Sequence, residues 1–86
     1  MTVNDGSGSP KDLLSYLARG LVDEPDSVSV REQVEPDGTI VLELSVAQDD
    51  YGNVIGRGGR TASALRTVVK TAAVKRGQRV FVDIVD

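Results

Sequence analysis

The sequence contains no cysteine and no histidine among its 86 residues. Without thiols the chain can form neither a disulfide nor a thiolate nucleophile, and without imidazole it lacks a common zinc ligand and the usual base that activates a serine. Aromatic residues are also few: two tyrosines and one phenylalanine. These absences exclude zinc sites built on cysteine or histidine, and they argue against a binding surface made of stacked aromatic rings.

Long apolar runs are absent as well. No stretch approaches the roughly 20 residues needed to cross a bilayer, and residues 1–9 have neither the basic nor the apolar segment of a signal peptide. We therefore expect a cytoplasmic protein. Residues 1–8 are polar and rich in glycine and serine, which predicts a flexible N-terminal tail. The remaining length suits one domain with one modest core over residues 9–86.

Acidic residues are missing from one continuous third of the chain. Residues 51–82 contain no Asp or Glu and hold seven basic residues: Arg57, Arg60, Arg66, Lys70, Lys75, Arg76 and Arg79. All thirteen acids lie elsewhere, so the net charge of −3 divides into +7 for this segment and −10 for the remainder. Because exposed helices usually mix both signs, this asymmetry indicates a basic face directed at a polyanion. The alternative is a solvated helix face that lacks acids by chance.

The N-terminal half of the chain begins with a predicted helix. Ser9, Pro10 and Asp12 are typical of a helix start, because serine caps free N–H groups, proline suits the first position and a carboxylate favours this end of the helix dipole. Gly20 and Pro25 bound the end of the helix. Its inward positions recur at helical spacing: Leu13, Leu14, Leu17, Ala18 and Leu21.

Two apolar runs that alternate with a period of two then predict a β-hairpin. They are marked by Val28, Val30 and Val34 in the first strand and by Ile40, Leu42, Leu44 and Val46 in the second. The Glu-Pro-Asp-Gly sequence at 35–38 lies between them. It is typical of a turn, in which proline fixes one φ angle and glycine accepts a positive one.

The acid-free segment predicts two helices and a third strand. Asp49 or Asp50 caps a short helix over 51–55, and a longer helix runs over 60–76. Residues 79–85 form an edge or central strand. The long helix has an inward stripe, followed after its last turn by a terminating glycine: Ala62, Leu65, Val69, Ala72, Ala73 and then Gly77. The order α-β-β-α-α-β predicts an α+β fold with three helices on one face of a three-stranded sheet.

A glycine loop, Gly56-Arg57-Gly58-Gly59, joins the two helices of this segment. Such a loop presents backbone N–H groups at the start of the second helix, whose dipole favours a phosphate. Residues without side chains also let a sugar-phosphate backbone come close. Arg57 can add a bidentate contact to phosphate oxygens, and Arg60 lies next to it. A plain turn between two helices is the alternative.

The residues around this loop resemble a known family. Residues 54–65, Val-Ile-Gly-Arg-Gly-Gly-Arg-Thr-Ala-Ser-Ala-Leu, resemble the hydrophobic-hydrophobic-Gly-x-x-Gly core of the KH domain, whose GxxG loop clamps a short single strand. With its element order, the chain is similar over nearly all of 10–86 to the bacterial type II form. Residues 60–70 are similar to the small bacterial KH proteins called KhpA. The resemblance implies a single KH domain with a mixed sheet, acting in post-transcriptional regulation, as an RNA chaperone, or in control of cell shape and elongation.

The resemblance also implies where RNA binds. The implied RNA-binding residues are Ile55, Gly56, Arg57, Gly58, Gly59, Arg60 and Thr61. The groove would lie between the 50–55 helix, the first turns of the 60–76 helix and the 40–46 strand, with Ile55 and Thr61 as walls for bases. Recognition would cover about four nucleotides and be weak, because one short groove supplies few contacts.

The long helix also carries a strip of small residues beside its inward stripe. Val68 lies off that stripe near Ala64 and Thr71, and another helix could pack against them. The alternative is a partly buried shoulder of the same core. The resemblance to KhpA implies a homodimer, or pairing with a larger KH-containing protein known as KhpB, Jag or EloR. A protein assembly module that acts mainly through such dimerisation is therefore the alternative to RNA binding.

No catalytic motif accompanies these features. The glycine loop lacks the spacing of a Walker A motif and the third glycine of a dinucleotide-binding fingerprint. Asp49 and Asp50 are explained by helix capping, and Ser63 lies outside any nucleophile motif. We expect no enzymatic activity, no metal, no cofactor, no membrane association and no small-molecule substrate.

Overall fold

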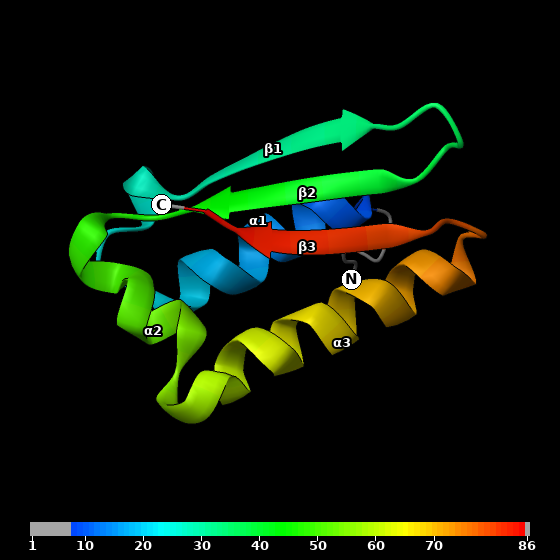
Figure 1. The fold of residues 1–86 in the computed structure, drawn as a ribbon. Helices are drawn as coiled ribbons and strands as arrows, with labels where there is room; N and C mark the ends of the chain where they lie inside the picture. Colours follow the sequence, from blue (N-terminus) through cyan, green and yellow to red (C-terminus); the bar gives the residue numbers. More distant parts are fainter. Residues whose placement is uncertain (1–7, 86) are drawn as a thin grey trace.

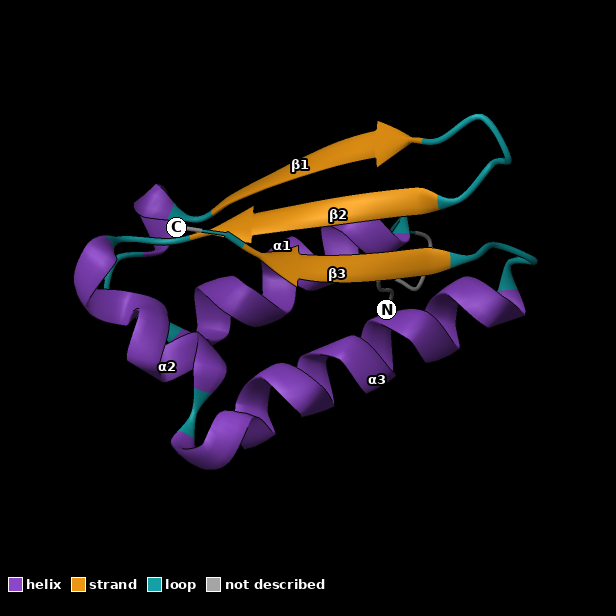
Figure 2. Ribbon diagram, in the orientation of Figure 1, coloured by secondary structure: helices purple, strands orange, loops and turns teal. Residues whose placement is uncertain are grey.

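Three helices lie on one face of a three-stranded sheet in the computed structural model, which describes residues 8–85 (Figure 1). The elements are α1 (Pro10–Leu21), β1 (Ser29–Val34), β2 (Ile40–Ser45), α2 (Tyr51–Ile55), α3 (Arg60–Lys75) and β3 (Val80–Ile84). Short 3-10 turns lie in the connections, at Pro25–Ser27, Gln48–Asp50 and Arg57–Gly59 (Figure 2). The predicted order α-β-β-α-α-β and the α+β class are confirmed. The tail expected at 1–8 lies, apart from Gly8, outside the described residues.

The sheet is mixed, and β2 is its central strand. β1 runs antiparallel to β2 and β3 runs parallel to it. A parallel pair of strands needs a crossover connection, which α2 and α3 supply. β3 is an edge strand of the sheet and lies beside α3 (Figure 1). The hairpin turn forms as predicted: Gly38 has a φ of 90°, and Asp37 Oδ1 accepts a hydrogen bond from Thr39 N–H at 2.9 Å.

The core lies between the helices and the inner face of the sheet. Its fully buried residues come from all three helices and from β2: Leu14, Ala18, Leu42, Leu44, Val54, Val69 and Ala73. The alternation predicted for the second strand is confirmed, since its four apolar residues are all buried. The first strand differs from the prediction, because Val34 is 65% exposed. β1 is the edge strand on the side away from α3, and the helices leave its far end uncovered (Figure 1).

Helix α1 begins and ends where the sequence predicts. Ser9 Oγ accepts Asp12 N–H at 3.2 Å, and Asp12 Oδ2 accepts Ser9 N–H at 3.4 Å, which together form a capping box. Gly20 lies in its last turn, and the helix ends at Leu21, between the predicted bounds Gly20 and Pro25. Beyond the helix, the N–H groups of Asp23 and Glu24 are held by a carboxylate from another part of the chain, which directs the backbone away.

Helix α3 ends at Lys75, and Gly77 is the terminating glycine after its C-cap, as predicted. The N–H groups of Gly77 and Gln78 donate to the carbonyl oxygens of Val74 and Ala73, both at 2.9 Å, and this pair of bonds is a Schellman motif. Four of the five predicted inward residues of α3 are buried, and Ala72 is half-buried. In the described part of the chain, no helix is both long enough and apolar enough to span a membrane.

Candidate nucleic-acid interface

The loop between α2 and α3 turns through three glycines with positive φ. Gly56, Gly58 and Gly59 have φ angles of 74°, 63° and 76°, a region that residues with side chains rarely adopt. Gly59 N–H donates to Gly56 O at 3.1 Å, and Arg60 N–H donates to Arg57 O. These bonds form a tight turn, so the predicted break between the two helices is confirmed.

Gly56 is required by a close contact as well as by its conformation. A Cβ atom there would lie 2.2 Å from Thr61 Oγ1, 2.7 Å from Thr61 Cβ and 2.9 Å from Thr61 N. Thr61 was expected to form a wall for bases, but it is half-buried with its side chain beside this glycine. By contrast, a Cβ at Gly58 or Gly59 would have no such neighbour within 4 Å. The backbone at Gly56 therefore packs against α3, whereas the backbone at Gly58 and Gly59 has open space beside it.

The open part of the loop coincides with the start of α3. Gly59 is the N-cap residue and has no side chain to accept hydrogen bonds from the first turn. The first N–H groups of a helix lack intrahelical acceptors, and the helix dipole makes this end favourable for an anion. The start of α3 is thus favourable for a negatively charged group, although its first N–H, that of Arg60, is already bonded to Arg57 O.

Two exposed arginines, Arg57 and Arg60, flank this helix start. Neither forms a salt bridge within residues 8–85, where the ion pair between Arg31 and Glu43, at 3.8 Å, is the only one. Ile55, which ends α2 next to the loop, is 40% exposed. The structure therefore brings two free cations and one aliphatic side chain together beside the open glycines.

Two further basic residues, Arg66 and Lys70, lie on the flank of α3 that faces β3. Arg66 Nε donates to Val82 O at 3.2 Å, and Lys70 Nζ lies 5.0 Å from the centre of the Phe81 ring. Both side chains are therefore held along the seam between α3 and β3. Sequence reasoning did not assign them to the site, although their four-residue spacing, which puts two side chains on one side of a helix, was a usable signal.

β3, and not β2, is the strand beside these basic residues. The resemblance implied a groove bounded by the 40–46 strand, but β2 lies between β1 and β3 and its inward residues are buried beneath the helices. β3 bonds to β2 through alternate residues, as in the bond from Ile40 N–H to Arg79 O at 2.9 Å. The carbonyl of Val82 therefore points to the open edge, where Arg66 meets it.

Asp50, predicted as a possible helix cap, binds elsewhere. It occupies the N-cap position of α2, but its carboxylate makes no capping hydrogen bond. Instead, Oδ1 accepts Asp23 N–H at 3.0 Å and Asn53 Nδ2 at 2.8 Å, while Oδ2 accepts Glu24 N–H at 3.1 Å. These hydrogen bonds, the one from Asp23 above all, hold the pKa of Asp50 below its ordinary value, although burial of the carboxylate acts in the opposite direction.

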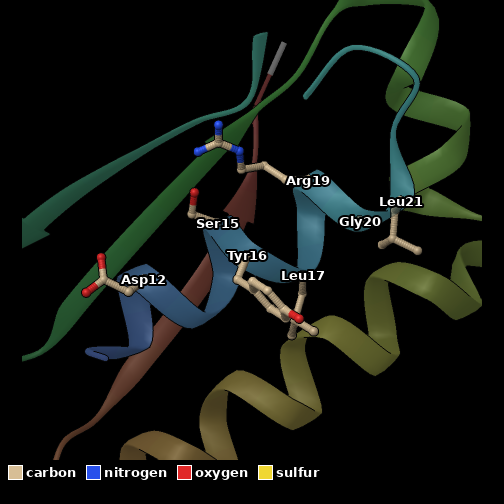
Figure 3. Close-up of a pocket in the computed structure, with 7 residues that line it drawn as sticks. All are labelled: Asp12, Ser15, Tyr16, Leu17, Arg19, Gly20 and Leu21. Carbon is tan, nitrogen blue, oxygen red and sulfur yellow. The ribbon is translucent and has the colours of Figure 1, made fainter. Parts of the chain in front are cut away.

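A second surface, small and apolar, lies on the flank of α3 opposite Arg66. Its exposed residues are those predicted for a dimer face: Ala64, Val68 and Thr71. Val68 is 46% exposed, so about half of its side chain is open to a partner. From α1, Tyr16, Leu17 and Leu21 point toward α3 and help to line an open hollow (Figure 3). Helix α1 thus has an apolar patch of its own, which sequence reasoning did not assign to the site.

Known proteins match nearly the whole described chain. The family model for the KhpA/KhpB KH domain matches residues 11–84. The chain is 53% identical over 75 residues to the RNA-binding protein KhpA of Clostridium acetobutylicum, and 52% identical over 77 residues to that of Halalkalibacterium halodurans. These two alignments cover 87% and 88% of this chain, and 99% of each relative.

Among solved structures, the fold is similar to part of the protein Era. The structure of Aquifex aeolicus Era bound to GDP.AlF4- gives a TM-score of 0.60 at 16% identity, covering 87% of this chain and 29% of that one. Era in complex with MgGDPNP and nucleotides 1506–1542 of 16S ribosomal RNA gives the same TM-score and identity. At this identity the likeness concerns the fold alone. The family match over 11–84 and the identities above one half show that the chain belongs to the KhpA/KhpB KH-domain family.

Proposed function

We propose that this chain binds short single-stranded RNA through the loop Gly56–Gly59, as a post-transcriptional regulator or RNA chaperone. The observation that carries the proposal is the open start of α3 with Arg57 and Arg60 beside it, neither of them in a salt bridge within the described residues. The relatives add support, because they are named RNA-binding proteins. No group in this arrangement needs a metal or a cofactor to attract a phosphate.

Backbone and cations have separate parts in this binding. A phosphate at the start of α3 is stabilised by the helix dipole and by N–H groups, and the open glycines let the sugar come close. The Arg57 guanidinium can donate two parallel hydrogen bonds to phosphate oxygens. Arg66 and Lys70 lie about 9 Å and 15 Å along α3 from Arg60, at a rise of about 1.5 Å per residue. The basic track thus continues beyond the loop, along the seam with β3.

Charge reversal in the loop tests this assignment. Arg57→Asp combined with Gly58→Asp should weaken binding of a labelled single-stranded RNA by about tenfold or more, because repulsion replaces a charge-assisted contact. For the unmodified chain, two or three phosphate contacts predict a log–log salt slope of roughly −1.5 to −2 in fluorescence anisotropy titrations. Circular dichroism checks that both proteins are folded.

A matched variant shows whether the position or only the charge matters. Arg19→Asp makes the same charge change as Arg57→Asp, on an exposed arginine of α1 that points away from α3 (Figure 3). We expect Arg19→Asp to reduce RNA affinity much less than Arg57→Asp. If the two lose the same affinity, or if the loop double variant binds like the unmodified chain, the loop is not the RNA site.

The apolar flank of α3 favours a second function, self-association. Val68 is exposed beside the small residues Ala64 and Thr71, and Tyr16 and Leu21 are exposed on α1; such apolar patches are of the kind that another helix covers. The partner is a second copy of the chain or a larger KH-containing protein of the KhpB, Jag or EloR type. Two weak RNA sites held in one assembly gain effective concentration, which offsets the few contacts that each makes.

Light scattering tests the dimer face. Val68→Asp should lower the mass in solution from about twice 9.1 kDa to 9.1 kDa, because a buried, unpaired carboxylate at an interface is costly. Val74→Asp is the control, since Val74 is 72% exposed on a different side of α3. The face is wrongly assigned if Val68→Asp leaves the mass unchanged, or if both variants lower it equally.

A further inference from the structure

Helix α2 leads the chain into the RNA-binding loop, yet it is only five residues long. So short a helix is not stable by itself, because few hydrogen bonds offset the cost of its first turn. Its orientation therefore depends on contacts with the rest of the fold. Val54 is fully buried in the core, and the Tyr51 hydroxyl donates a hydrogen bond to Val85 O. Since Gly56 follows α2 directly, any tilt of this helix moves the loop.

The densest set of these contacts is made by Asp50, at the N-terminal end of α2. Asp50 is 2% exposed, and its carboxylate accepts two backbone N–H groups, of Asp23 and Glu24, together with the amide of Asn53. The two backbone donors lie 27 and 26 residues earlier in the sequence, in the connection from α1 to β1. Hydrogen bonds to a charged acceptor are stronger than neutral ones, and burial strengthens them further.

We propose that Asp50 is the positioning residue of the RNA-binding loop: by holding the Asp23 and Glu24 N–H groups it fixes the tilt of α2, and with it the path of Gly56–Gly59. This inference rests on the proposed function and adds to it, because Asp50 makes no contact with RNA itself. The connection from α1 to β1 and the loop then form one coupled unit. Altering either end of this unit changes the other.

The adjacent residue, Asp49, provides a control with the same change of charge. Asp49 is exposed and Asp50 is buried, and replacing either by Asn removes one negative charge. Removal of a negative charge alone favours binding to a polyanion. Asp49→Asn should therefore bind RNA as tightly as the unmodified chain or slightly more tightly. Asp50→Asn should bind roughly two- to thirtyfold more weakly, because an amide offers one acceptor oxygen where the carboxylate offers two.

Two readouts separate positioning from a loss of stability. Both variants are compared at a temperature at which circular dichroism shows them folded. The salt slope of RNA binding should stay the same in Asp50→Asn, since the phosphate contacts are misplaced but not removed. The NMR amide signals of residues 56–59 should move in Asp50→Asn and not in Asp49→Asn. If Asp50→Asn binds RNA as Asp49→Asn does, the inference is overturned.

Hydrogen exchange on the unmodified chain gives a test that needs no variant. Coupling between two sites is reciprocal, so saturating single-stranded RNA should slow the exchange of the Asp23 and Glu24 amides. Unchanged exchange rates would also overturn the inference.

Failure of the proposed function can be told apart from failure of this inference. If the unmodified chain binds no RNA, or if Arg57→Asp binds RNA normally, both the proposed function and the inference are wrong. If RNA binding depends on the loop but Asp50→Asn does not change it, only the inference is wrong.

Discussion

The glycines of the loop Gly56–Gly59 are held by different constraints, although they look alike in the sequence. Gly56 combines a positive φ with a neighbour, Thr61, that leaves no room for a Cβ atom. Gly58 and Gly59 have a positive φ and open surroundings. The sequence shows that this loop requires glycine. It does not show which glycine tolerates substitution least, because the contact with Thr61 exists only once the first turn of α3 lies against the loop.

This difference predicts unequal costs of substitution. Gly56→Ala should lower the free energy of unfolding by about 3 kcal/mol, since it adds a steric clash to backbone strain. Gly58→Ala should lower it by only about 1 kcal/mol, from strain alone. Urea denaturation followed by circular dichroism measures both values. Equal losses at the two positions would show that the contact with Thr61 is relieved at little cost.

A second prediction at this scale concerns acid. The pKa of Asp50 lies below the ordinary value of 3.8, so the folded protein binds this proton less tightly than the unfolded chain does. The stability that results is complete above about pH 3.8 and is lost as the pH falls through the lower, folded-state pKa. Asp37 has a pKa shift of the same sign, caused chiefly by its hydrogen bond from Thr39.

The urea midpoint at neutral pH and at about pH 3 measures this loss. We expect the midpoint to fall more steeply with acid in the unmodified chain than in Asp50→Asn, which has no carboxylate at this position to protonate. Asp49→Asn should retain the full fall, because Asp49 is exposed and only Asp50 holds the connection from α1. The contribution of Asp50 is contradicted if its replacement leaves the acid dependence unchanged.

Among the elements, sequence patterns predict most accurately where residues close in the chain decide the structure. The capping box at Ser9, the hairpin turn at 35–38 and the end of α3 before Gly77 are local motifs, and all three form as expected. The partners of Asp50 were missed. They are backbone N–H groups that lie 26 and 27 positions away in the sequence, and no sequence pattern marks them.

The two flanks of α3 illustrate how one helix can serve two functions. Arg66 and Lys70 face β3 on one flank, and Val68 and its small neighbours are exposed on the other. Val69 lies between the flanks and is fully buried. The acid-free segment indicated the basic flank in the sequence, but only the fold shows which strand it meets. Because the flanks point apart, the proposed RNA binding and self-association are separable by mutation.

For the whole molecule, the topology of the sheet decides which strand can neighbour the site. The alternating pattern of residues 40–46 correctly predicted a strand, and the same pattern argued for its burial. The resemblance nevertheless implied that this strand borders the groove. In the fold it is central, and the last strand occupies the open edge beside α3. Strand order depends on which segments meet in space, and the sequence had left β3 open as an edge or central strand.

The separation of charge along the chain becomes a separation in space. Most basic residues of 57–79 follow the loop and α3, although Arg79 lies beside Asp37 of the hairpin, whereas many acidic residues occupy the hairpin and the connection from α1 to β1 (Figure 1). The side of the molecule along α3, which includes the proposed binding site, is therefore the more positive one. In the field of a polyanion such a molecule turns while it is still at a distance, so that it meets its target with the loop leading. The protein is then oriented before contact, and a larger share of encounters brings the loop to the polyanion.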